Sequence, residues 1–216
     1  MEILRDKAIM LRVRNPKQIT TAIPNSKELP MNKVVVKWGL DEVLSLRSLN
    51  INAPSPITKR YSWPGQYKPF DHQKDTASFM TLNKKSFCFN EQGTGKTASA
   101  IWAADYLMTQ GKVKRVLVIC PLSIMDSAWR NDLFSFAMHR TVDVAHGSKE
   151  KRKKIINSGA EFVIINYDGV EVVKDEIAAG GFDLFIVDEA THYKNAQTKR
   201  WKTLNKLIKE DDWLWM

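Results

Sequence analysis

Apolar runs and segments of helical periodicity alternate along the last 150 or so residues of the chain. The apolar runs are continuous rather than alternating with polar residues, which is typical of strands buried on both faces of a parallel sheet. The predicted strands cover residues 86–89, 115–120, 141–145, 161–166, 182–187 and 213–216. The helices predicted between them cover residues 71–82, 98–108, 125–137, 149–157, 170–178 and 198–209. This alternation predicts a three-layer α/β domain with a parallel sheet.

The first 60 residues have a different pattern. Residues 8–14 and 34–38 are predicted strands, and residues 40–49 are a predicted helix with two acids in its first turn. The two prolines of Asn52–Pro56 interrupt both helix and sheet, so this stretch is predicted to be a linker. The chain therefore divides into a small α+β accessory module, residues 1–60, with two or three strands and a helix, and an α/β domain, residues 61–216.

Composition narrows the class of protein. The chain has 216 residues, 44% of them hydrophobic, which is enough for a substantial core. It contains no apolar run of about 18 residues and no signal-type start, so neither a membrane span nor secretion is expected. Its two cysteines, Cys88 and Cys120, lie in predicted buried strands without metal-ligand spacing. We therefore expect a reducing, cytoplasmic location and no zinc site.

The charge balance favours a polyanionic partner. Lys and Arg exceed Asp and Glu by 33 to 24, a net charge of +9, and nucleic acid is the obvious candidate. The densest basic run is Lys149–Lys154. It could contact phosphates, but runs of charge are more often the solvated face of a helix, and we favour that interpretation.

The stretch Asn90–Thr97 has the composition of a phosphate-binding P-loop. It follows the predicted strand 86–89 and precedes an Ala-rich helix, which is the context such a loop requires. Lys96 is expected to reach the β- and γ-phosphates and Thr97 to bind Mg²⁺. Asn90 replaces the usual first glycine, and we expect it to be tolerated because Asn adopts left-handed backbone angles readily. The alternative is an ordinary glycine turn at a helix start.

Two carboxylates, Asp188 and Glu189, directly follow the predicted strand 182–187. The carboxyl ends of parallel strands meet at one edge of a sheet, where ligands bind in such folds. Asp188 is predicted to contact the Mg²⁺, and Glu189 to orient or deprotonate the attacking water. The alternative is a pair of exposed acids that cap the next helix.

With both motifs placed, residues 67–216 resemble the first RecA-like lobe of superfamily 2 helicases, in particular Snf-type DNA translocases of bacteria and phages. Phe70–Gln73 resembles the Q-motif, which implies that Gln73 reads the adenine edge and Phe70 lies against the ring. Asn90–Thr97 resembles motif I, where this family often has Asp in place of the first Gly. The resemblance implies that ATP and Mg²⁺ are the cofactors. The residues it implies for nucleotide binding are Gln73, Phe70, Gln92, Gly93, Thr94, Gly95, Lys96 and Thr97.

Other segments resemble the parts of this family that face nucleic acid. Val118–Ser123, followed by Trp129, is similar to motif Ia, and Val163–Tyr167 is similar to a later strand end. Val187–Asn195 resembles motif II with its trailing Lys-Asn. The candidate nucleic-acid contacts are Ser123, Asn166, Tyr167 and Lys194. Double-stranded DNA is the expected partner, although these residues do not distinguish it from RNA.

The sequence departs from the family pattern at two places. Thr191 occupies the fourth position of the motif II box, where this family usually has His, and His192 follows it. The family's His couples ATP hydrolysis to motif III, so the resemblance does not assign that role to a residue here. A Thr-Gly-Thr-Pro-like motif III is expected directly after Trp213–Met216, and the 216 residues do not contain it. They also lack the second RecA-like lobe with its arginine finger. We therefore expect ATP binding with little or no turnover by these residues alone.

Three functions are compatible with these observations. The first is the ATP-binding lobe of a nucleic-acid-dependent ATPase that a second lobe or a partner protein completes. The second is a naturally truncated single lobe that acts as a regulator or inhibitor through DNA or protein contacts. The third is a P-loop ATPase of another branch, which the matches at Gln73 and Trp129 disfavour.

Two residue types are assigned to structure rather than chemistry. Trp102, Trp129 and Trp201 lie at helical positions, and indoles at such positions are more often packing residues than base-stacking platforms. The four histidines show no metal-ligand spacing.

Overall fold

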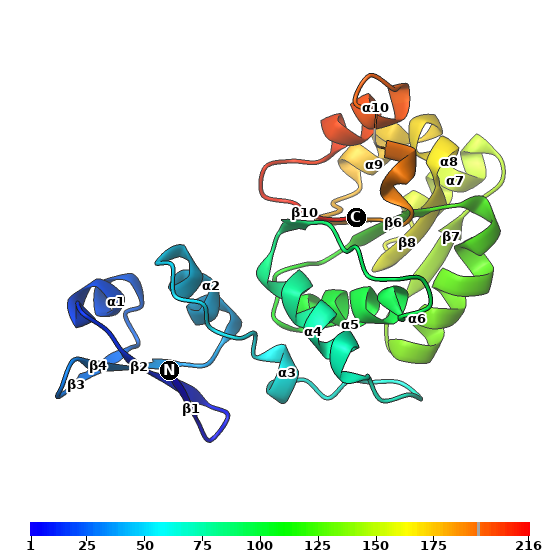
Figure 1. Ribbon diagram of the computed structural model, residues 1–216. Helices are drawn as coiled ribbons and strands as arrows, with labels where there is room; N and C mark the ends of the chain where they lie inside the picture. The colour runs from blue at the N-terminus through cyan, green and yellow to red at the C-terminus, as the bar shows by residue number, and fades with distance from the viewer. Residues whose placement is uncertain (194) are drawn as a thin grey trace. The chain divides into compact units, whose positions relative to one another are not determined.

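The structure, a computed structural model, describes residues 1–193 and 195–216 and divides into two units, residues 1–62 and 63–216 (Figure 1). Each unit has its own sheet and its own buried side chains. The division lies two residues beyond the boundary predicted from the sequence.

The first unit is built on a four-stranded antiparallel sheet of order β1-β2-β4-β3. Its strands are β1 Glu2–Leu4, β2 Ala8–Arg12, β3 Lys27–Leu29 and β4 Lys33–Lys37, and its helices are α1 Pro16–Ala22, α2 Leu40–Ser48 and α3 Ile57–Arg60. Alternate residues of β2 and β4, such as Ile9 and Val36, are fully buried. The sequence pattern missed β1, β3 and α1, because elements of three, three and seven residues are too short to show a clear period.

The prediction that Asn52–Pro56 is a linker is wrong. Ser55 is fully buried, and the buried Trp38 donates its indole N–H to the carbonyl of Pro54 at 2.9 Å. Arg60 donates to the carbonyl of Trp38 at 2.6 Å. The prolines do stop regular structure here, but tertiary contacts hold the segment inside the first unit.

The second unit contains a six-stranded sheet of order β5-β10-β9-β6-β8-β7, with all pairs parallel. Its strands are β5 Lys85–Ser86, β6 Val116–Cys120, β7 Val142–Ala145, β8 Phe162–Asn166, β9 Leu184–Val187 and β10 Trp213–Trp215. Every residue of β6 and β9 is buried, as expected for central strands covered on both faces. The predicted three-layer α/β class is confirmed.

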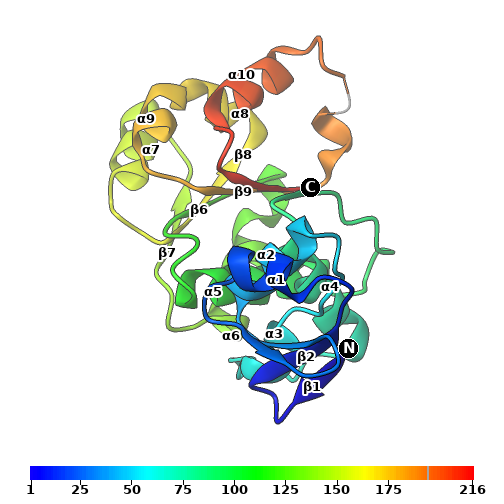
Figure 2. The ribbon, with the colours of Figure 1, turned by 90° about the vertical axis from the view of Figure 1, so that its left-hand side faces the viewer.

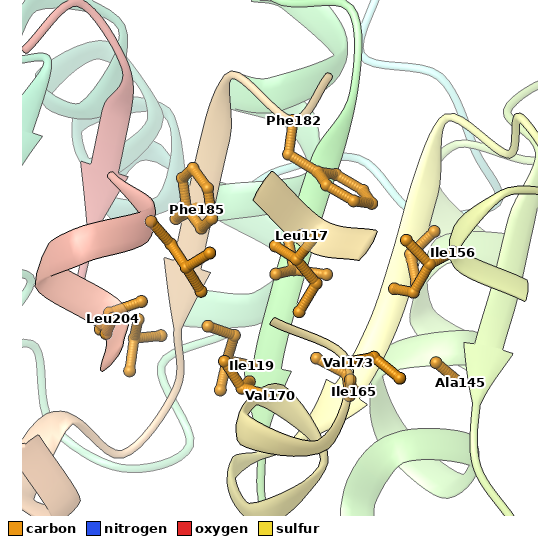
Figure 3. Close-up of a cluster of buried hydrophobic side chains, with 14 of the residues drawn as sticks. Leu117, Ile119, Ala145, Ile156, Ile165, Val170, Val173, Phe182, Phe185 and Leu204 are labelled. Carbon is orange, nitrogen blue, oxygen red and sulfur yellow. The ribbon is translucent and has the colours of Figure 1, made fainter. Parts of the chain in front are cut away.

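Helices cover both faces of this sheet (Figures 1 and 2). One layer contains α4 Asp71–Leu82, α5 Lys96–Thr109 and α6 Asn131–Phe136. The other contains α7 Lys149–Ile156, α8 Tyr167–Val172, α9 Lys174–Ala179 and α10 Lys199–Leu207. Figure 3 shows the core beneath this second layer, where Leu117, Ile119 and Phe185 of the central strands meet Val170 and Leu204.

Some elements of the second unit differ from their predictions, and the helix predicted over 170–178 is two helices, α8 and α9. The strand before the P-loop ends at Ser86, and Phe87 and Phe89 are 54% and 88% exposed. β5 is at the edge of the sheet with β10 as its neighbour, so apolar sequence alone did not make these residues core. Cys88 is accordingly half-buried and outside any strand, contrary to its prediction. The helix predicted over 125–137 starts instead with a 3₁₀ turn, Leu122–Ile124, and a π-helical turn, Met125–Arg130.

Candidate nucleotide site

The P-loop connects β5 to α5 and ends at Lys96, the first residue of the helix. Gly95 has φ +75°, and a Cβ atom there would lie 2.1 Å from Nε2 of Gln73, so only glycine fits. The Lys96 ammonium donates to the carbonyls of Asn90 and Glu91, both at 2.9 Å. These two bonds hold the lysine across the loop, beside the positive end of a fourteen-residue helix.

Asn90 is tolerated for a reason other than the predicted one. Its φ is not positive, so the expectation of a left-handed backbone is wrong. Instead, its Nδ2 donates to the hydroxyl of Thr76 on α4 at 2.7 Å. The side chain thus anchors the start of the P-loop to the neighbouring helix, a contact that a glycine could not make.

Gln73 is buried, and its side chain bonds two segments of the site. Its Oε1 accepts from the N–H of Phe70 at 2.9 Å, and its Nε2 donates to the carbonyl of Thr94 in the P-loop at 3.4 Å. Phe70 is 68% exposed and stacks on His72, with ring centroids 5.7 Å apart. A flat apolar surface therefore lies open beside a carboxamide held against the P-loop.

Asp188 follows β9 and is oriented by several hydrogen bonds. Its N–H donates to the carbonyl of Ile119 at 2.9 Å, and its Oδ1 accepts from the N–H of Glu189 at 3.0 Å. Its Oδ2 accepts from the indole N–H of Trp129 at 2.9 Å. Both carboxylate oxygens are therefore fixed in direction.

Glu189 is exposed and has a left-handed backbone, with φ +52°, which is uncommon for a residue with a side chain. The adjoining peptide is held by Tyr167, whose hydroxyl donates to the carbonyl of Asp188 at 2.6 Å. His192 lies 3.8 Å from a carboxylate oxygen of Glu189 and packs on the ring of Tyr167. Because Tyr167 and His192 hold the turn on either side of Glu189, its unfavourable φ angle persists.

A cavity of about 660 Å³ brings the two motifs together. Lys96 and Thr97 line it from the P-loop, and Asp188 and Glu189 line it from the end of β9. The rest of its lining is mostly apolar and includes Phe87, Phe89, Trp129, Trp201, Trp215 and Met216. Residues about 90 positions apart in sequence thus share one site at the carboxyl ends of the strands.

The donor set fits Mg²⁺ better than a metal caged by protein. Among the described residues, the Thr97 hydroxyl has no hydrogen-bond partner, and no group of three or more His, Cys, Asp or Glu gathers as a metal site. Mg²⁺ commonly takes one or two protein oxygens and completes its shell with water and substrate phosphates. The Thr97 hydroxyl and the Asp188 carboxylate would match that number of oxygen ligands.

Burial keeps two groups next to the acidic pair protonated. It raises the pKa of the Cys120 thiol to about 12, and the charges of Asp188 and Glu189 add to this effect. Burial likewise raises the pKa of Tyr167, again with help from Glu189 and Asp188. Cys120 is therefore no thiolate nucleophile at neutral pH, and Tyr167 keeps the proton that it donates to Asp188.

The candidate nucleic-acid residues lie in different surroundings. Ser123 is exposed in the 3₁₀ turn after β6. Asn166 is half-buried and accepts from Arg152 at 2.9 Å, and Tyr167 is buried, so neither side chain is free at the surface. Lys194 lies outside the described residues. Arg152 of the basic run also donates to the carbonyls of Ala145 and Gly147, which makes it a structural residue.

Sequence reasoning missed the role of Trp129. It was predicted to pack, and it is 98% buried, but it also donates to the carboxylate of Asp188, 59 residues away. Helical periodicity marks such a residue as buried and carries no information about its polar partner. Trp102, by contrast, packs as predicted and donates to the carbonyl of Pro64.

Comparison with known proteins gives a consistent picture. The sequence model of the SNF2-related domain matches residues 72–215. An uncharacterized ATP-dependent helicase of Bacillus subtilis is 26% identical over 67% of this chain and 25% of its own length. The ISWI chromatin-remodeling complex ATPase ISW2 of Saccharomyces cerevisiae is 30% identical over 50% of this chain and 10% of its own length. The chain thus spans a quarter or less of these two relatives.

Solved structures agree with the sequence matches. The SWI2/SNF2 ATPase core of Sulfolobus solfataricus in complex with dsDNA superposes with a TM-score of 0.62 and 25% identity, over 71% of this chain and 32% of that one. None of the helices in the described part of the chain combines the length and the hydropathy of a membrane span. The parallel sheet, the P-loop facing the Asp188–Glu189 pair and the family match together establish that this chain belongs to the SNF2-related domain family, as an N-terminal RecA-like lobe.

Proposed function

We propose that this lobe binds Mg·ATP as half of a nucleic-acid-dependent ATPase that acts on duplex DNA. The observation that carries the proposal is the shared cavity, which Lys96 and Thr97 line on one side and Asp188 and Glu189 on the other. A cation, a hydroxyl and two carboxylates at the carboxyl ends of parallel strands are the groups that phosphoryl transfer requires.

Each group has a distinct proposed role. Lys96 exchanges its two P-loop carbonyls for phosphate oxygens, while the P-loop N–H groups around Gly93 and Gly95 face the polyphosphate. Thr97 and Asp188 hold Mg²⁺, which neutralises phosphate charge. Glu189 orients the attacking water, an expectation that its exposure at the cavity wall supports. Gln73 recognises adenine, and Phe70 covers the ring.

Duplex DNA is the proposed track, and Ser123, Asn166, Tyr167 and Lys194 are its proposed contacts. The S. solfataricus neighbour was solved in complex with dsDNA, which supports this choice of partner. Turnover is expected to need a second lobe. The alternative of a single-lobe regulator stays a hypothesis that no observed contact favours.

Replacing one lysine tests the nucleotide site. Lys96→Ala should remove detectable Mg·ATP binding by calorimetry, because it deletes the charge expected at the β- and γ-phosphates. Lys114→Ala removes an equally charged but exposed side chain at the amino ends of the strands and should leave affinity unchanged. Equal affinity in Lys96→Ala and the unsubstituted chain would contradict the proposal.

A further inference from the structure

Trp129 lies outside the two motifs and contacts the carboxylate of Asp188, the proposed metal ligand. Its indole N–H lies 2.9 Å from Oδ2 of Asp188, and the ring is 98% buried. An indole can donate one hydrogen bond and accept none, so it fixes the carboxylate without competing for the metal. The other oxygen, Oδ1, is fixed by the N–H of Glu189.

The backbone around Trp129 is unusual as well. The residue lies in a π-helical turn, Met125–Arg130, and such turns occur frequently at functional sites. Trp129 lines the same cavity as Lys96 and Asp188. Trp102 has the same burial and an equivalent hydrogen bond to a carbonyl, but it lies in a regular helix and does not line the cavity.

We propose that Trp129 is a positioning residue that orients Asp188 for Mg²⁺. This inference rests on the proposed Mg·ATP site. Partners of this kind typically change metal affinity 10- to 100-fold when they are removed, because a free carboxylate must be ordered as the metal binds. In this role Trp129 acts through the carboxylate of Asp188.

The test is the Mg²⁺ concentration that gives half-maximal binding of a fluorescent ATP analogue. Trp129→Phe should raise it about 10-fold and leave metal-free nucleotide affinity unchanged. Trp102→Phe loses a similar ring and a similar hydrogen bond, so it should cost comparable stability but leave the Mg²⁺ dependence unchanged. No shift in Trp129→Phe, or an equal shift in Trp102→Phe, would overturn the inference. An unsubstituted chain that fails to bind nucleotide would instead contradict the proposed function.

A second measurement needs no tryptophan substitution and no metal. In the ¹⁵N-labelled chain, the seven indole N–H groups give separate resonances, and Asp188→Ala should move the one that has lost its charged acceptor. If no indole resonance moves, the hydrogen bond to Asp188 does not exist in solution and the inference fails.

A separate observation concerns the first unit, which lies outside the matched family domain. Residues 1–62 contain eleven of the 33 Lys and Arg but only five of the 24 Asp and Glu, so they carry six of the nine net positive charges. Part of this excess positive charge lies on one surface of the first unit. Ile9, Leu11, Val34 and Val36 point into the core, so the alternate positions of the strands form the opposite face of the sheet.

Four cations lie on this opposite face, which we call the basic sheet face: Arg12, Lys27, Lys33 and Lys37. Arg12 lies directly opposite Lys33 on the neighbouring strand, an arrangement of like charges that destabilises a sheet. Within the described chain none of the four makes an ion pair. Protection of sheet edges explains Lys27 on β3, but the other three cations belong to the inner strands β2 and β4.

We propose that the basic sheet face binds the phosphate backbone of duplex DNA. Lys33 and Lys37 are four residues apart on β4, or about 13 Å. That separation is close to the roughly 12 Å width of the major groove of B-DNA, whose two rims carry the phosphates. In duplex RNA the major groove is narrow and deep, which makes it a poorer match.

Matched charge removal in the full chain tests this contact without nucleotide. Replacing Arg12, Lys27, Lys33 and Lys37 by Gln should weaken binding to a short DNA duplex and lower the slope of log K against log salt by about 3. The control replaces four exposed lysines of the second unit by Gln: Lys149, Lys151, Lys154 and Lys206. The control should change the slope by less than about 1.

Equal losses of DNA affinity in both variants would show that binding depends only on net charge, and would overturn the proposal. A loss of affinity in the control variant alone would also overturn it. Tighter binding of duplex RNA or of anionic lipid vesicles than of DNA would also overturn it. Because ATP is absent from this assay, the result is independent of the proposed nucleotide site.

Discussion

The polar side chains at the two ends of the parallel strands differ in how completely they are hydrogen-bonded. At the amino ends, Arg115 precedes β6 and donates to the carbonyls of Ala160, Ile156 and Gly180. Its guanidinium also lies 4.3 Å from the ring centroid of Phe182. Asp183 precedes β9 and accepts from the N–H groups of Lys114 and Arg115.

At the carboxyl ends, Asp188 and Asn166 are hydrogen-bonded, but other polar side chains are bound less completely. Lys96 bonds only to carbonyls of its own loop, the Thr97 hydroxyl has no partner among the described residues, and Glu189 is exposed on a left-handed backbone. The amino ends therefore use polar groups to join strands and helices. The carboxyl ends keep polar groups available at a cost in stability, which is typical of functional sites.

The largest effect on stability is expected at Arg115. Arg115→Ala leaves three backbone carbonyls without their donor and removes the contact with Phe182, so the free energy of unfolding should fall by about 3 kcal/mol in urea denaturation. Nucleotide affinity of the folded protein should not change. Arg130→Ala, which removes an exposed pair with Asp126, should cost less than about 0.5 kcal/mol. A loss of nucleotide affinity in Arg115→Ala would break the division between the two ends.

Glu161, which precedes β8, makes the amino ends sensitive to acid. Burial alone would raise its pKa, but the N–H of Thr141 and the guanidinium of Arg140 donate to the carboxylate and lower the pKa below its usual 4.5. A lowered pKa in the folded state means that the stabilisation is complete above the unfolded value and is lost as the pH falls through the folded value. Stability that depends on Glu161 should therefore decline below about pH 4.5.

The measurement is the difference in urea unfolding free energy between the unsubstituted chain and Glu161→Gln. We expect about 1 kcal/mol at neutral pH, because a charge-assisted bond to Arg140 is replaced by a neutral one, and a smaller difference at about pH 3. A difference that stays constant over this range would show that Glu161 does not titrate with folding.

Much of the second unit was predictable because its sequence pattern is regular. Continuous apolar strands predicted a parallel sheet, and the order of strands and helices follows the prediction closely. The P-loop and Asp188 were expected at one edge of the sheet, and they line one cavity. The assignment to Snf-type proteins is confirmed by the family match.

What failed depended on contacts between residues distant in sequence. Trp102 and Trp129 both lie at buried positions of predicted helices. The indole of Trp102 donates to the carbonyl of Pro64, whereas the indole of Trp129 donates to the carboxylate of Asp188. Phe87 and Phe89 are apolar, but they lie beyond the end of the edge strand β5 and are exposed. Asn52–Pro56 is rich in proline, but Trp38 and Arg60 bond around it and keep it packed.

The smallest expected effect has the opposite sign and tests whether the carboxyl ends give up stability. Glu189 has φ +52°, an angle that costs of order 1 kcal/mol for a residue with a side chain and little for glycine. Its side chain is 58% exposed, so its removal loses little packing. Glu189→Gly should raise the free energy of unfolding by about 0.5 kcal/mol, because the greater freedom of glycine in the unfolded chain offsets part of the relieved strain. Glu189→Ala keeps the unfavourable angle and should not raise it. Equal stability changes in the two variants would show that the backbone at Glu189 is unstrained, whereas a gain only in glycine would show that its left-handed angle costs stability.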